Sequence, residues 1–66
     1  MDIIAERIKS KREQKNMTQD EVAKIMGISR VSYTLYETGK NKPSLKNLIK
    51  LADIFETSID YLVGRY

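Results

Sequence analysis

Apolar residues recur at every third or fourth position along most of the chain, which is the spacing of helices with one buried face. In the first stretch, Ile4, Ala5 and Ile8 fall on one side of a helix that spans about residues 3–14. No stretch alternates between apolar and polar residues as a half-buried strand does. The pattern therefore predicts an all-α protein.

The second predicted helix has a marked start and a marked end. It is expected over about residues 18–26 and begins in the sequence TQDE. This is a capping box, in which the Thr18 side chain accepts a hydrogen bond from a backbone N–H and Glu21 reaches back to the Thr18 backbone. Gly27 ends the helix, because glycine readily takes the left-handed conformation found at helix ends.

A third helix follows almost at once, over about residues 29–37. Ser29 caps its start and Gly39 stops it. Only Gly27 and Ile28 separate the second helix from Ser29, so the two helices must cross at a steep angle. The sequence thus predicts a pair of short helices joined by a tight turn.

Two further helices complete the expected fold. Ser44 can cap the fourth helix and Ser58 the short fifth one. The five helices are expected to form one compact bundle. The residues of the second and fourth helices that we expect to face its interior are Val22, Ala23, Ile25, Met26, Leu45, Leu48, Ile49, Leu51, Ala52 and Phe55.

The third helix has apolar residues on two opposite faces. At about 100° per residue, Tyr33 and Tyr36 fall on one side, and Val31 and Leu35 fall on the other. The tyrosine side is the better candidate for the core, because aromatic side chains bury more apolar area. The second apolar face then requires a role outside the core.

An ion pair is predicted from the tyrosine face of the third helix. Glu37 lies on this face, where an unpaired carboxylate would be costly to bury. Arg12 lies on the same face of the first helix as Ala5 and Ile8, so it also points inward. We therefore predict a bidentate Arg12–Glu37 pair that braces the third helix against the first.

Composition excludes several classes of function. The chain has 66 residues and contains neither cysteine nor histidine. This removes disulfides, thiol chemistry, most metal sites and the usual general base at neutral pH. We therefore expect no enzyme, no metal and no cofactor.

No apolar run approaches the ~20 residues of a membrane span and no signal peptide opens the chain. We therefore expect a soluble, cytoplasmic protein without a membrane partner.

Charge is unevenly distributed along the chain, whose net charge is +3. Residues 7–15 contain five basic residues against one acid, and residues 38–50 contain four lysines and no acid. Residues 53–60, in contrast, contain three acids and no base. A basic side with an acidic end favours a polyanionic partner on the basic side, although solvated helix faces would give the same composition.

The stretch MTQDEVAKIMGISRVSYTLYETGKNKPSLKNLIKLADIF resembles the phage-repressor type of helix-turn-helix DNA-binding domain, the Cro/cI or xenobiotic-response-element family. The shared features are the Thr-Gln start of the second helix, the alanine four residues after that glutamine, the glycine at the turn and Ser-Arg at the entry of the third helix. The resemblance covers about residues 3–63. It implies a lambda-repressor-like five-helix bundle in which residues 1–66 are a single helix-turn-helix domain.

The resemblance further implies a sequence-specific transcriptional regulator of the repressor kind that binds double-stranded DNA. The third helix would lie in the major groove and read base edges. Residues at the family's base-reading positions are Arg30, Val31, Thr34 and Leu35. Those expected to hold phosphates are Gln19, Ser29, Ser32, Lys40, Asn41, Lys42, Lys11 and Arg7.

DNA reading would explain why the third helix has a second apolar face. Val31 and Leu35 can pack against the C5-methyl group of thymine, and Arg30 can make a bidentate pair with guanine. The family often has polar residues at the positions of Val31 and Leu35. An alternative is therefore a protein-interaction module on the same fold, with weak or no specific DNA binding.

Dimerisation is also implied, because one helix-turn-helix reads only a short half-site and related proteins bind two-fold sites as dimers. We expect a homodimer on a palindromic operator. The final residues, DYLVGRY, resemble the end of the DNA-binding part of longer repressors, so the chain is either a small regulator or that part of a longer one. The expected interface is Ile59, Tyr61, Leu62, Val63 and Tyr66, although these residues could instead complete the core of one chain.

Overall fold

The structure is a computed structural model and describes residues 2–65. Within this range the chain forms five helices and no strand, as the sequence predicts. None of these helices combines the length and the hydropathy needed to cross a lipid bilayer. The helices are α1 (Ile3–Gln14), α2 (Gln19–Met26), α3 (Arg30–Thr38), α4 (Leu45–Ile54) and α5 (Ile59–Leu62).

The capping box at the start of α2 is confirmed. The Glu21 backbone N–H donates to Thr18 Oγ1 at 3.1 Å, and the Thr18 backbone N–H donates to Glu21 Oε1 at 2.8 Å. Gly27 ends the helix with a φ of 75°, in the left-handed region that a side chain would disfavour. These contacts lie within a few residues of each other and mark the start and the end of α2 locally.

The turn between α2 and α3 is as short as predicted. Ser29 is the N-cap of α3, and its Oγ accepts a hydrogen bond from the Ser32 backbone N–H at 3.1 Å. The Ile28 backbone N–H donates to the Ala23 carbonyl at 3.0 Å, which closes the end of α2. The chain therefore turns sharply and starts α3 close to the place where α2 ends.

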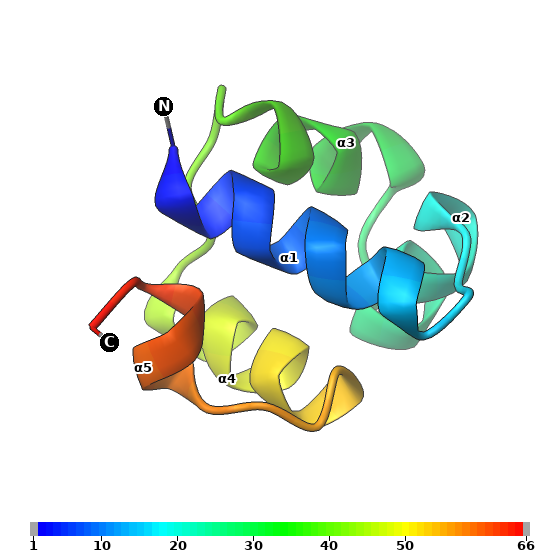
Figure 1. The fold of residues 1–66 in the computed structure, drawn as a ribbon. Coiled ribbons are helices and arrows are strands. Elements are labelled where there is room, and N and C mark those ends of the chain that lie inside the picture. The colour runs from blue at the N-terminus through cyan, green and yellow to red at the C-terminus, as the bar shows by residue number, and fades with distance from the viewer. Residues whose placement is uncertain (1, 66) are drawn as a thin grey trace.

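Figure 1 shows how the helices are arranged. Helix α1 crosses the molecule with α3 along one side and α5 near the other, and α2 lies toward its C-terminal end. Helix α4 packs against α2 and α5. At the end of α2, the Met26 carbonyl accepts a hydrogen bond from Lys50 Nζ of α4 at 3.3 Å, and a positive charge is favourable at a helix C-terminus.

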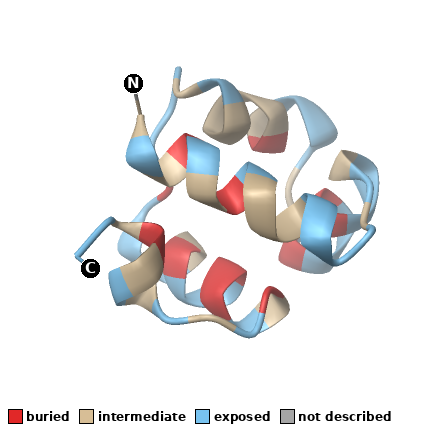
Figure 2. Cartoon of the chain, viewed as in Figure 1, coloured by how far each residue is buried: buried red, intermediate tan, exposed pale blue. Residues whose placement is uncertain are grey.

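The core is built from the inward faces of all five helices, as the buried residues in Figure 2 show. Tyr33 and Phe55 are its largest side chains and are almost completely buried. Tyr36 packs against this core, and its hydroxyl accepts a hydrogen bond from Asn47 Nδ2 at 2.9 Å. The tyrosine face of α3 is therefore the buried face. The core residues are Ile8, Val22, Ala23, Met26, Tyr33, Leu51, Ala52, Phe55 and Leu62.

Three residues that the sequence analysis placed in the interior are instead exposed. Ile25 is 61% exposed, Leu45 66% and Ile49 45%. The prediction was wrong because it counted apolar residues without weighing their angles around each helix. At about 100° per residue, Ile25 lies far from the direction shared by Val22 and Met26. Ile49 is similarly turned away from the buried arc of α4. Leu45 lies within about 20° of the buried Ala52, but it is the first residue of α4 and stays exposed there.

This correction predicts opposite costs for two apolar substitutions on α2. Val22→Ala removes part of a fully buried side chain and should lower the free energy of unfolding by about 2 kcal/mol. Ile25→Ala removes exposed atoms and should change it by no more than about 0.5 kcal/mol. Urea unfolding of both variants measures these changes, and equal losses would put Ile25 back in the core.

Candidate nucleic-acid interface

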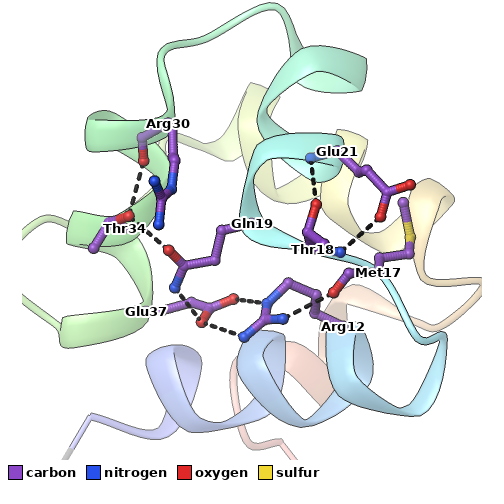
Figure 3. A network of polar contacts seen from close by, with 8 residues as sticks. All are labelled: Arg12, Met17, Thr18, Gln19, Glu21, Arg30, Thr34 and Glu37. Atoms are coloured by element: carbon purple, nitrogen blue, oxygen red, sulfur yellow. Dashed lines mark hydrogen bonds and ion pairs between the residues drawn. The ribbon is translucent and has the colours of Figure 1, made fainter.

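Arg12 of α1 and Glu37 of α3 form the bidentate ion pair that the sequence predicts (Figure 3). Arg12 donates from Nε to Glu37 Oε2 at 2.6 Å and from Nη2 to Oε1 at 3.1 Å. The two side chains are only 14% and 3% exposed. Such a pair is short, planar and directional, so it fixes the rotation of α3 relative to α1.

The same guanidinium also holds the connection between α1 and α2. Arg12 Nη1 donates to the Met17 carbonyl at 2.8 Å, one residue before the N-cap of α2. The Met17 backbone N–H in turn donates to the Arg12 carbonyl at 3.1 Å. One arginine therefore ties together α1, the start of α2 and the end of α3.

The Glu37 carboxylate is stabilised in its charged form. Burial by itself raises the pKa of Glu37, but hydrogen bonds from Arg12 and Gln19 outweigh burial and hold the pKa below its ordinary value. The buried Tyr33 hydroxyl lies near this carboxylate and also lowers its pKa, although it makes no hydrogen bond of good geometry with a described residue. Burial and the nearby Glu37 charge raise the pKa of Tyr33, so its hydroxyl stays neutral at physiological pH.

Gln19, the first residue of α2, extends this network toward the surface of α3. Its Nε2 donates to Glu37 Oε1 at 3.0 Å, and its Oε1 accepts from Thr34 Oγ1 at 2.8 Å. The sequence analysis assigned Gln19 only to a phosphate and missed this bridge. Nothing in the sequence around Gln19 indicates its hydrogen bonds to Glu37 and Thr34, because these depend on the angle at which α2 crosses α3.

The outward face of α3 is the one opposite Tyr33. Arg30 is exposed, and Val31 is 71% exposed, which is the highest value among the exposed large apolar residues of the described chain. Leu35 and Thr34 flank Val31 and are half-buried. The four predicted base-reading residues therefore lie on one side of one helix, and a single exposed cation stands at its start.

Most of the predicted phosphate ligands lie at the ends of α2 and α3. Ser29 is exposed at the N-cap of α3, and Ser32 is half-buried one turn later. Lys40, Asn41 and Lys42 are exposed in the loop after α3. The Asn41 backbone N–H donates to the Leu35 carbonyl at 3.2 Å, which holds this loop against the end of α3.

Arg7 and Lys11 do not lie with the other predicted phosphate ligands. Both side chains lie over the Tyr61 ring of α5, with Arg7 Cζ at 4.3 Å and Lys11 Nζ at 4.9 Å from the ring centroid. Arg7 Nη1 also donates to the Tyr61 carbonyl at 2.7 Å. These two cations hold α5 on α1, on the side of α1 away from Arg12 and α3.

The predicted dimer residues occupy different environments. Leu62 is completely buried in the core of its own chain and has no surface to offer a partner, which corrects its assignment to the interface. Ile59, Tyr61 and Val63 are half-buried. Tyr66 lies outside the described residues.

The family model described as helix-turn-helix matches residues 8–62. The chain is 46% identical over 63 residues to the cryptic phage CTXphi transcriptional repressor RstR of Vibrio cholerae, covering 96% of this chain and 56% of RstR. It is 40% identical over 60 residues to the transcriptional regulator AnsR of Bacillus subtilis, covering 91% of this chain and 52% of AnsR. The chain thus spans about half the length of these curated relatives.

Solved structures agree with the family match. The P22 c2 repressor protein, crystallised with synthetic operator 9T, superposes with a TM-score of 0.86 and is 30% identical, with 91% of each chain covered. A transcriptional regulator from Listeria innocua also gives a TM-score of 0.86 at 30% identity, with 92% of this chain and 57% of that chain covered. The five-helix fold is therefore the one found in these repressors and regulators.

The lowered pKa of Glu37 predicts an acid-dependent loss of stability. Because its pKa in the folded chain lies below the value of about 4.3 expected when unfolded, the charged carboxylate stabilises the fold above that pH. This contribution is lost as the pH falls through the folded pKa. The free energy of unfolding of wild type should therefore exceed that of Glu37→Gln at pH 7, and the difference between the two should shrink toward pH 3.

Urea unfolding of both proteins between pH 7 and 3 measures this difference. Glu56→Gln is the control, since the ion pair of Glu56 with Lys15 lies in solvent and its removal should matter far less. A wild-type advantage over Glu37→Gln that stays constant with pH would show that the charge of Glu37 does not stabilise the fold.

Proposed function

The chain belongs to the Cro/cI-type helix-turn-helix family, and we propose on that premise that it regulates transcription by binding double-stranded DNA sequence-specifically. Residues 1–66 would act as a single DNA-binding domain, of the repressor kind. Two similar proteins support this role: RstR is a transcriptional repressor, and the P22 c2 repressor was crystallised with a synthetic operator.

The outward face of α3 is the observation that carries this proposal. The exposed Val31 side chain offers apolar area that a partner could cover, and it lies beside Arg30 at the start of α3. The major groove of B-DNA is wide enough to accept a helix, and α3 is held rigidly by the ion pair at its far end. Helix α3 would enter the groove with Arg30 and Val31, near its N-terminus, directed at the bases.

The chemistry of this face suggests which bases it reads. Arg30 carries two parallel N–H donors that match the O6 and N7 acceptors of guanine. Val31 and Leu35 have no hydrogen-bonding groups and would pack against thymine methyl groups. A half-site with at least one guanine and several thymines would satisfy all three side chains.

Phosphate contacts would hold the helix in register on both sides of the groove. Lys40, Asn41 and Lys42 follow α3 in an exposed loop, and Ser29 and Ser32 lie at its start. Gln19 keeps a second Nε2 hydrogen beyond the one that it donates to Glu37, so it can still donate to a phosphate beside the N-terminus of α2. These contacts position the protein without selecting a base.

A homodimer on a palindromic site would follow from the small reach of one such helix. Ile59, Tyr61 and Val63 are the predicted interface residues that retain some surface. Two copies would place their α3 helices about one turn of DNA apart, roughly 34 Å. The proposal assigns no catalytic step to the chain, and it places the protein in the cytoplasm with the DNA that it binds.

Selection from a random duplex pool tests the proposed function. The chain should enrich a palindromic site and bind it at least ~10³-fold more tightly than a scrambled duplex at physiological salt. The logarithm of the affinity should fall steeply with the logarithm of the salt concentration. Weak and equal binding of both duplexes would contradict the proposal and make the Val31 face a surface for a protein partner.

Two variants separate base reading from phosphate binding in the same assay. Arg30→Ala should cost about 1–3 kcal/mol on the selected site and relax its preference at one base pair. Lys42→Ala should weaken binding to the selected and scrambled duplexes alike and reduce the salt slope by about one. If Arg30→Ala behaved in the same way as Lys42→Ala, Arg30 would be a phosphate ligand.

A further inference from the structure

Thr34 lies on the outward face of α3, but its hydroxyl is turned back into the protein. Thr34 Oγ1 is 2.8 Å from Gln19 Oε1 and 2.9 Å from the Arg30 carbonyl oxygen. Both neighbours are acceptors, and a hydroxyl has one hydrogen to donate. Whichever acceptor receives that hydrogen, Thr34 has none left for a base.

The orientation of the Gln19 amide is set by chemistry. Glu37 carries a charged carboxylate, which can only accept hydrogen bonds, and its pKa is lowered by its partners. The Gln19 group that faces it at 3.0 Å must therefore be the NH2. This places the Gln19 carbonyl oxygen toward Thr34, so the amide cannot flip to offer Thr34 a donor instead.

The Thr34 oxygen keeps its acceptor lone pairs, but it is directed toward Gln19 and the Arg30 carbonyl, so the group of Thr34 free to face a partner is its methyl group. Figure 3 shows the hydroxyl directed toward Gln19 and the Arg30 carbonyl, with the methyl carbon pointing away from both. Thr34 is three residues after Val31 on α3, so the two side chains are neighbours on the helix surface. The methyl group of Thr34 therefore extends the apolar surface that begins at Val31.

We propose that Thr34 reads DNA as a methyl group and not as a hydroxyl, by packing against the C5-methyl of a thymine. A threonine with a free hydroxyl can hydrogen-bond to several bases and selects weakly among them. The chain from Arg12 through Glu37 and Gln19 removes that freedom from Thr34. The inference rests on the proposed function and names a specificity-determining contact within it.

The test replaces thymines by uracils, one at a time, in the duplex that the wild-type chain selects. Uracil lacks only the methyl group, so each replacement measures one methyl contact. At least one replacement should weaken wild-type binding about fourfold, the equilibrium factor for one methyl-sized group removed from water. Two variants of Thr34 then identify the contact on the protein side, and thermal unfolding checks that each remains folded.

Thr34→Ser keeps the hydroxyl and removes the methyl group. It should bind the selected duplex about fourfold more weakly and lose all sensitivity to one uracil replacement, as coupled partners do in a double-mutant cycle. Thr34→Val keeps the methyl group and removes the hydroxyl, so it should retain both the affinity and the sensitivity of wild type. Val31→Ala is the matched control and should remain sensitive to the uracil that Thr34→Ser ignores.

Other results would overturn the inference. If Thr34→Val lost as much affinity as Thr34→Ser, the hydroxyl would contact the DNA and could accept from an adenine or cytosine amino group. If Thr34→Ser kept its sensitivity to every uracil, or if the selected site held no thymine, the methyl contact would be absent while the proposed function stood. If no duplex were selected, the proposed function would fail and the inference with it.

Discussion

The bidentate ion pair between Arg12 and Glu37 is the constraint on which the arrangement of the other helices depends. Its two side chains are only 14% and 3% exposed, and it joins the first helix to the end of the third. A third bond from the same guanidinium holds the residue before the α2 N-cap. Removing either charge would leave the other buried without its partner, which costs far more than the loss of a surface pair. The position of α3 is thus determined from the side opposite its outward face.

A polar network at this site has a second consequence. Gln19 and Thr34 form hydrogen bonds in sequence from Glu37 outward, so the ion pair determines which atoms α3 presents on its surface. A core of well-packed apolar residues could hold two helices together equally well. Such an apolar core could not orient the Gln19 amide or hold the Thr34 hydroxyl in a hydrogen bond. The network therefore links the stability of the bundle to the chemistry of its outward face.

Much of this architecture follows from the sequence because it depends on local signals. The capping box at Thr18 and the Ser29 cap are each specified within a few residues, so the start of each helix was predictable. The Arg12–Glu37 pair was predictable too, because two inward charges far apart in sequence need each other. Ile25 and Ile49 were misplaced because apolar character alone does not give the angle of a side chain around its helix, and Leu45 was misplaced because it is the first residue of α4. The Gln19 bridge was missed because it depends on how α2 crosses α3, and the contacts of Arg7 and Lys11 with Tyr61 were missed because they depend on how α5 packs against α1.

The ion pair should shape the outward face of α3 as well as stabilise the bundle. The most direct test replaces both charges with apolar residues of similar size, Arg12→Met together with Glu37→Leu, and compares affinity for a selected and a scrambled duplex. The double variant should remain folded, since an apolar pair can substitute for a buried ion pair. Its preference for the selected duplex should fall about fourfold, the factor for one methyl contact, because Gln19 without the carboxylate no longer holds the Thr34 hydroxyl away from the bases. A folded double variant with the full preference of wild type would show that the network does not shape the reading face.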